Sequence, residues 1–108
     1  MPKTKPLPKS KFDLDLIFDD RHDFYTLVYD CTSAMILEGP DKATVDNKAV
    51  LIRAIRLNEK GERIWHYGEN NPKWLLDFVE HNEDEILSRL QEKLNARSEQ
   101  LIRQYEDS

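Results

Sequence analysis

The sequence predicts a small α+β domain in the order strand, helix, strand, strand, helix, with a β-hairpin and a long C-terminal helix. Three observations indicate this fold class. Apolar residues occupy every even position from 12 to 18 with Asp13 and Asp15 between them, a Gly-bearing turn at 58–61 separates two apolar segments, and the segment after Pro72 repeats apolar side chains at helical spacing. The chain has 108 residues, which suits one domain.

The first eleven residues, MPKTKPLPKSK, are predicted to form a flexible basic arm outside the core. Three prolines and four lysines leave little to bury, so we expect this arm to be extended or disordered. It is either a solvated tail or a contact for nucleic acid or an acidic partner through Lys3, Lys5, Lys9 and Lys11. The α+β core is then expected over residues 12–82 and the C-terminal helix over 83–108.

Residues 12–18, FDLDLIF, are predicted to form the first strand. The apolar side chains at even positions would face the core, and Asp13 and Asp15 would share the opposite face. Two carboxylates at this spacing can bind a metal ion. They also mark the solvated side of a strand, or guard a strand at the edge of a sheet.

Residues 20–38 are predicted to form a helix, because one spacing pattern covers the whole segment. Gly39 and Pro40 would end it, and its apolar stripe would consist of Phe24, Leu27, Val28, Cys31 and Met35. The stretch FYTLVY within this segment has strand propensity instead. A strand in place of part of this helix is therefore the alternative.

A β-hairpin is predicted to follow a loop over residues 40–48. Its arms are residues 50–57 and 62–67, joined by a turn from Asn58 to Gly61 in which Gly supplies the left-handed conformation. The apolar spacing also fits a helix over 44–59, but the chemistry of the turn favours the hairpin.

One face of this hairpin is a candidate binding surface. If Asn58 pairs with Gly61, then Arg56 lies opposite Arg63, and Trp65 and Tyr67 follow on the same face. Two arginines beside two aromatic rings would form a platform for nucleobases or for an acidic peptide. Alternatively, the two aromatic side chains belong to the core beneath a helix.

The segment after Asn71 is predicted to be helical, with Asn71 as the N-cap and Pro72 in the first turn. A second capping signal at Asn82 predicts a break or bend. Beyond it, leucines recur at steps of three and four. This seam either packs on a second copy or a partner, or lies over its own sheet; the residues expected to make the contact are Leu87, Leu90, Leu94, Leu101 and Tyr105.

Composition narrows the classes of function. Without the arm lysines, the body has 12 basic side chains against 21 acidic ones, which is a poor match for phosphate backbones. The single cysteine, Cys31, cannot form an internal disulfide and suits a reducing, cytoplasmic location. No apolar run approaches the roughly 20 residues of a membrane span, so we expect no membrane association.

No catalytic or metal-binding constellation is recognisable. The three histidines lack metal-ligand spacing, although His22 lies among aspartates. Cys31 falls on the apolar stripe without the flanking glycines of a nucleophile turn, and three glycines provide no phosphate-binding loop. We therefore expect no enzymatic activity, no cofactor and no metal.

The leading hypothesis is a non-catalytic protein-interaction module: a regulator, adaptor or assembly subunit. It would bind a protein partner or a second copy of itself through the C-terminal helix. The alternative is a nucleic-acid-binding module that uses the arm lysines and the Arg/Trp/Tyr face of the hairpin. A metal-dependent hydrolase built on Asp13, Asp15 and His22 is the third hypothesis.

Overall fold

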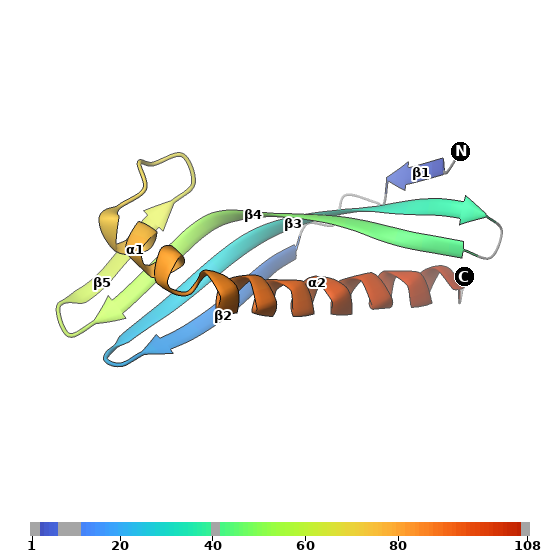
Figure 1. The fold of residues 1–108 in the computed structure, drawn as a ribbon. Coiled ribbons are helices and arrows are strands. Elements are labelled where there is room, and N and C mark those ends of the chain that lie inside the picture. The colour runs from blue at the N-terminus through green and yellow to red at the C-terminus, as the bar shows by residue number, and fades with distance from the viewer. Residues whose placement is uncertain (1–2, 7–11, 40–41, 107–108) are drawn as a thin grey trace.

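The computed structural model describes residues 3–6, 12–39 and 42–106, which form an antiparallel sheet with two helices on one face (Figure 1). The α+β class is therefore confirmed. In chain order, the elements are β1 (Lys3–Pro6), β2 (Phe12–Asp20), β3 (Asp23–Gly39), β4 (Lys42–Asn58), β5 (Gly61–His66), α1 (Lys73–His81) and α2 (Glu83–Glu106). Neither of these helices is both long enough and apolar enough to cross a membrane.

β3 is the central strand of the sheet. β2 and β1 pair with successive parts of one of its edges, β4 pairs with the other edge, and β5 lies beyond β4. β3 and β4 have 17 residues each whereas β2 has nine, so the β3–β4 ribbon extends past β2. α2 runs beside this ribbon toward its far end (Figure 1).

The helix predicted over residues 20–38 is wrong and the strand alternative is correct, because Asp20 ends β2 and the chain from Asp23 onward forms β3. Odd-numbered side chains from Tyr25 to Met35 point toward the helices, and the segment pairs with β2 on one side and β4 on the other. Val28 points to the opposite face of the strand and is also buried. The apolar residues of this segment therefore fit the spacing of a helix as well as that of a strand. Pairing along both edges satisfies the backbone groups of the segment, which overrides its local helical spacing.

The loop predicted over residues 40–48 is also wrong in its described part, since β4 already begins at Lys42. This strand contains a bulge: Val28 pairs with Arg53 but Tyr29 pairs with Leu51, so Ile52 is an extra residue. The bulge shifts the alternation of β4 by one residue. Ala54 faces the helices on one side of the bulge, and Leu51, Ala49 and Asn47 face them on the other.

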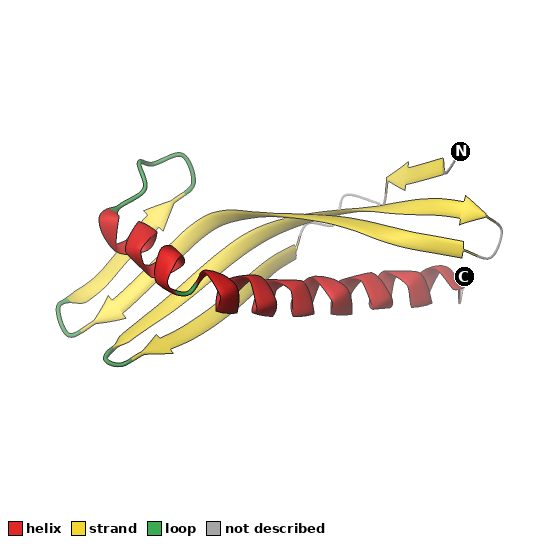
Figure 2. Cartoon of the chain, viewed as in Figure 1, coloured by secondary structure: helices red, strands yellow, loops and turns green. Residues whose placement is uncertain are grey.

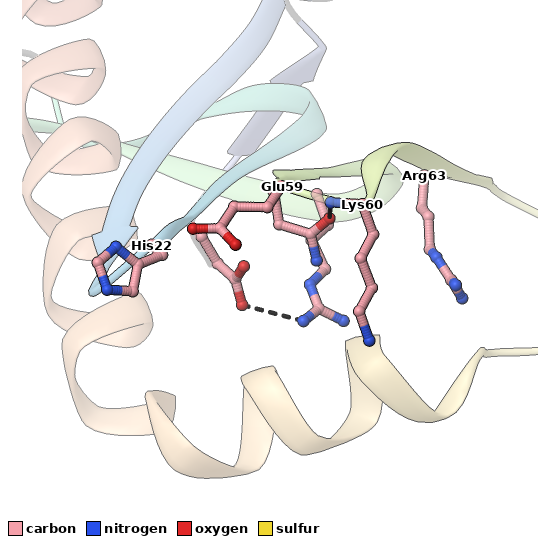
Figure 3. Close-up of a pocket in the computed structure, with 7 residues that line it drawn as sticks. His22, Glu59, Lys60 and Arg63 are labelled. Carbon is pink, nitrogen blue, oxygen red and sulfur yellow. Dashed lines mark hydrogen bonds and ion pairs between the residues drawn. The ribbon is translucent and has the colours of Figure 1, made fainter.

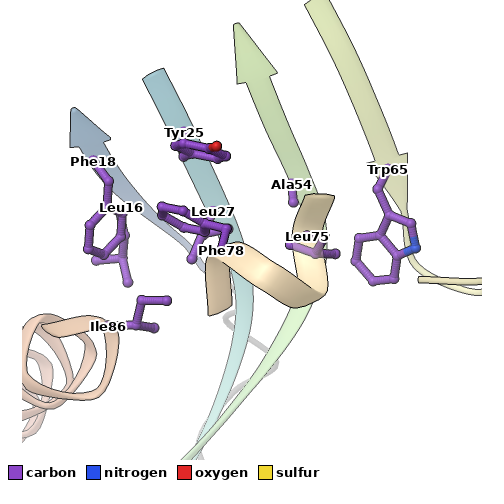
Figure 4. Close-up of a cluster of buried hydrophobic side chains, with 9 residues drawn as sticks. All are labelled: Leu16, Phe18, Tyr25, Leu27, Ala54, Trp65, Leu75, Phe78 and Ile86. Carbon is purple, nitrogen blue, oxygen red and sulfur yellow. The ribbon is translucent and has the colours of Figure 1, made fainter. Parts of the chain in front are cut away.

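The core lies between the sheet and the helices (Figure 4). Phe78 of α1 is its aromatic centre: its ring stacks on Tyr25 at 3.8 Å between centroids and meets Phe18 edge-on at 5.4 Å. The cluster consists of Leu16, Phe18, Tyr25, Leu27, Ala54, Trp65, Leu75, Phe78 and Ile86. Cys31 is buried, as the sequence predicted, on the same side of the sheet.

The helix boundaries differ from the prediction by one residue at the start. Pro72, rather than Asn71, is the N-cap of α1, and its carbonyl accepts hydrogen bonds from the amides of Leu75 and Leu76. The predicted break at Asn82 is confirmed. The backbone amide and side-chain amide of Asn82 both donate to the Phe78 carbonyl at 3.0 Å, and α2 starts at the next residue.

Candidate protein-interaction face

Both helices pack on one side of the sheet, so no described element covers the other side (Figure 2). We call the outward-pointing side chains of this side the open face. Five of its large apolar side chains are about half exposed or more: Ile17 at 64%, Phe24 at 51%, Val50 at 51%, Leu57 at 48% and Ile64 at 47%. Soluble proteins rarely expose so many large apolar side chains together without an interaction to cover them.

Strand register brings four of these side chains into two neighbouring rows. Ile17, Thr26, Ile55 and Ile64 are directly opposite one another across β2, β3, β4 and β5. In the next row, Phe24 lies opposite Leu57. Successive rows on one face of a sheet are about 7 Å apart, so the two rows form one continuous apolar patch.

Charged side chains of opposite sign border this patch. Asp13, Asp15 and Asp19 point outward along β2. On the far side of the patch, Arg53 of β4 pairs with His66 of β5, in the same row as Asp15. The open face is therefore apolar in the middle and acidic along β2, with a positive charge at Arg53 of β4 and a further negative charge at Glu62 of β5, opposite Leu57.

The predicted leucine seam of α2 mostly faces the sheet of its own chain. Leu101 is buried, Leu94 is half-buried, and Leu90 packs against the core cluster. Only Leu87 of these four leucines is largely exposed, at 56%. Tyr105 lies in the last turn of α2, and its side chain is outside what the structure describes.

Two polar side chains, Asn47 and Arg89, fix α2 along the sheet. The Asn47 side chain on β4 donates to the Leu94 carbonyl at 3.2 Å and to the Ser98 hydroxyl at 2.6 Å. On the other side, the Arg89 guanidinium donates to the Ile17 carbonyl of β2, stacks over the Phe18 ring and pairs with Glu85 at 2.6 Å.

The hairpin register predicted from the turn is confirmed: Asn58 pairs with Gly61, and Arg56 pairs with Arg63. Trp65 is 6% exposed and belongs to the core, where its indole N–H donates to the Glu69 carbonyl at 3.2 Å. Tyr67 follows the end of β5 and is 70% exposed. The two aromatic side chains therefore do not form one exposed platform with the arginines.

Arg56 and Arg63 instead contribute to a pocket of about 310 Å³ where the β2–β3 and β4–β5 turns meet (Figure 3). Its lining is of mixed charge: His22, Asp23, Arg56, Asn58, Glu59, Lys60 and Arg63. Arg56 is held by Asp23 at 2.9 Å. Burial alone would raise the pKa of Asp23, but the hydrogen bond and charge of Arg56 outweigh it and lower this pKa.

The remaining candidate residues do not come together in one site. Asp13 and Asp15 are exposed on the open face, whereas His22 lies in the β2–β3 turn. Within residues 3–6, 12–39 and 42–106, no three His, Cys, Asp or Glu side chains cluster in a way that could hold a metal ion. Lys3 and Lys5 are in β1, which pairs with β3, and Lys9 and Lys11 are outside the described residues.

The sequence interpretation missed the open face because it placed Phe24 on the buried stripe of a helix. A signal was nevertheless present: Ile17 occupies a position of the same parity as Asp13 and Asp15, on the polar side of the predicted strand. Compared with protein-family models, curated proteins and solved structures, the chain shows no significant match to any of them.

Proposed function

We propose that this chain is a non-catalytic protein-binding module that docks a partner protein on the open face of its sheet. The observation that carries the proposal is the pair of apolar rows formed by Ile17, Ile55 and Ile64 and by Phe24 and Leu57. Covering these side chains removes apolar surface from water, which drives association.

The charges around the patch indicate what surface chemistry the partner would need. Its contact surface would be apolar at the centre, basic where it meets Asp13, Asp15 and Asp19, and acidic where it meets Arg53. Complementary charges at the rim orient a partner and accelerate its encounter more than they add to affinity. The leucine seam of α2 is mostly occupied by its own sheet, so our proposal places the contact on the open face instead.

The test compares the intact chain with two variants as bait for cellular proteins, using quantitative mass spectrometry. The open-face variant carries Phe24→Thr and Leu57→Thr, which keep strand propensity while removing exposed apolar surface. The matched control is Leu87→Gln, which removes an equally exposed side chain from α2. We expect a specific partner that the control retains and the open-face variant loses. A partner lost only with the Leu87→Gln control would refute the proposal.

Nucleic-acid binding is a second candidate, because Arg56, Lys60 and Arg63 converge on one pocket. It ranks second because Asp23 and Glu59 share that pocket. Such binding must weaken steeply with rising salt, and nuclease must abolish it. Recovery of nucleic acid with this salt dependence, undiminished by the open-face substitutions, would favour this candidate over the first.

A further inference from the structure

The edge of β4 is only partly covered. β5 pairs with Arg53–Asn58, and beyond this point no strand in the described part of the chain pairs with the Lys42–Leu51 edge. The covered part of the edge ends at Ile52. The hydrogen bond that the Tyr67 amide donates to the Ile52 carbonyl, at 2.7 Å, is the last one described between the two segments. An uncovered edge of this length presents a row of backbone donors and acceptors to any strand of matching chemistry.

The opposite edge of the sheet is obstructed. Along β2, the Arg89 guanidinium occupies the Ile17 carbonyl, which an added strand would need. The uncovered edge of β4 is instead fixed on its helix-facing side. The Asn47 side chain is hydrogen-bonded to the Ser33 hydroxyl of β3, at 2.5 Å, as well as to α2. A strand that is fixed in position loses little conformational freedom when another strand pairs with it.

We propose that this edge pairs with the same edge of a second copy, antiparallel about a two-fold axis at Asn47. In this register Asp46 lies opposite Lys48 of the other copy, and the same contact occurs twice by symmetry. Thr44 would lie opposite Val50, and Val45 opposite Ala49. The pairing extends from 43 to 51, so its centre at Asn47 is next to the middle of the uncovered Lys42–Leu51 edge.

Neighbouring registers are disfavoured by the same two charges. A two-residue shift in one direction places Asp46 opposite Asp46 of the second copy. A two-residue shift in the other direction places Lys48 opposite Lys48 of the second copy. Like charges directly opposite one another destabilise a strand pair. A one-residue shift places the helix-facing side chains of one copy on the outer side of the other. The charge pattern therefore selects one register.

The space at the end of the edge also fits this arrangement. A pocket of about 260 Å³ lies on the outer side, where Val50, Ile52 and Tyr67 contribute to its wall. In the proposed register, the small Thr44 side chain of the second copy arrives beside Val50. The β4 strand of the second copy would then pair with β4 beyond the point where β5 ends. The sheets of the two copies would form one continuous sheet.

The test is light scattering coupled to size exclusion over a range of concentrations of the full chain. We expect the unaltered chain to dimerise, and Asp46→Lys or Lys48→Asp to weaken dimerisation about tenfold or more, because each puts like charges opposite one another twice. The chain carrying both substitutions should dimerise again. An equimolar mixture of the two single variants should form a mixed dimer, because opposite charges then face each other at every position.

Two controls separate this inference from the proposed function. Lys93→Glu reverses an exposed charge on α2 and should leave dimerisation unchanged, and so should the open-face variant. Circular dichroism establishes that each variant is folded. A chain that stays monomeric at millimolar concentration overturns the inference, as does a dimer that both single charge reversals leave intact.

Discussion

Two residues three positions apart in β3 provide a direct test of which face of the sheet is buried. Leu27 is fully buried under the helices, and Phe24 is half exposed on the open face. In the helical interpretation of this segment, both belong to one apolar stripe. The two interpretations therefore predict opposite rankings for the alanine substitutions at these positions.

The structure sets the expected magnitudes. Leu27→Ala removes a fully buried side chain and leaves a cavity, so it should lower the free energy of unfolding by about 3 to 4 kcal/mol. Phe24→Ala removes more atoms, but only half of the side chain is withdrawn from water and no enclosed cavity results. Full burial of such a side chain contributes about 1.5–3 kcal/mol, so half of it corresponds to about 1 kcal/mol.

The assay is equilibrium unfolding in urea, followed by far-ultraviolet circular dichroism. Domains of this size are stable by about 5–15 kcal/mol, so the loss expected for Leu27→Ala is a large part of the total and easily measured. An equal or greater loss for Phe24→Ala would refute the reasoning. That outcome would place Phe24 in the core and remove the main support for an open face.

Two further predictions concern ionisable groups. Because Arg56 lowers the pKa of Asp23, their pairing stabilises the fold above the ordinary carboxylate pKa, and this contribution is lost as pH falls through the lowered value. Urea midpoints of the unaltered chain and Arg56→Met should therefore differ at neutral pH and converge as the pH falls below the ordinary Asp pKa of about 3.9; a gap of constant size would contradict this origin. Burial raises the pKa of the Cys31 thiol, so its reaction with an aromatic disulfide at pH 8 should follow unfolding, and rapid reaction of the folded chain would show that the thiol is accessible.

The sequence was sufficient for those features that local chemistry determines. The strand over residues 12–18, the turn from Asn58 to Gly61 and the helix break at Asn82 each depend on side chains that act within a few residues of one another. The Arg56–Arg63 pairing followed directly from the turn.

The remaining features depend on contacts between distant segments. Residues 23–39 carry both a helical and a strand pattern, and the choice depends on β2 and β4 supplying partners along both edges. The bulge at Ile52 changes which residues of β4 face the helices, so no fixed alternation could place both Asn47 and Ala54 on the same side. The open face could not be recognised before the helices were known to share one side.

The order of elements along the chain also has a consequence for synthesis. Within the described residues, all five strands precede both helices, so a ribosome completes these strands before it makes the segment that covers the core side. Until α1 emerges, Leu16, Leu27 and Trp65 have no helix to pack against, and until α2 emerges, Arg89 does not obstruct β2. Nascent chains on neighbouring ribosomes are therefore most prone to associate with one another while residues 73–106 are being synthesised.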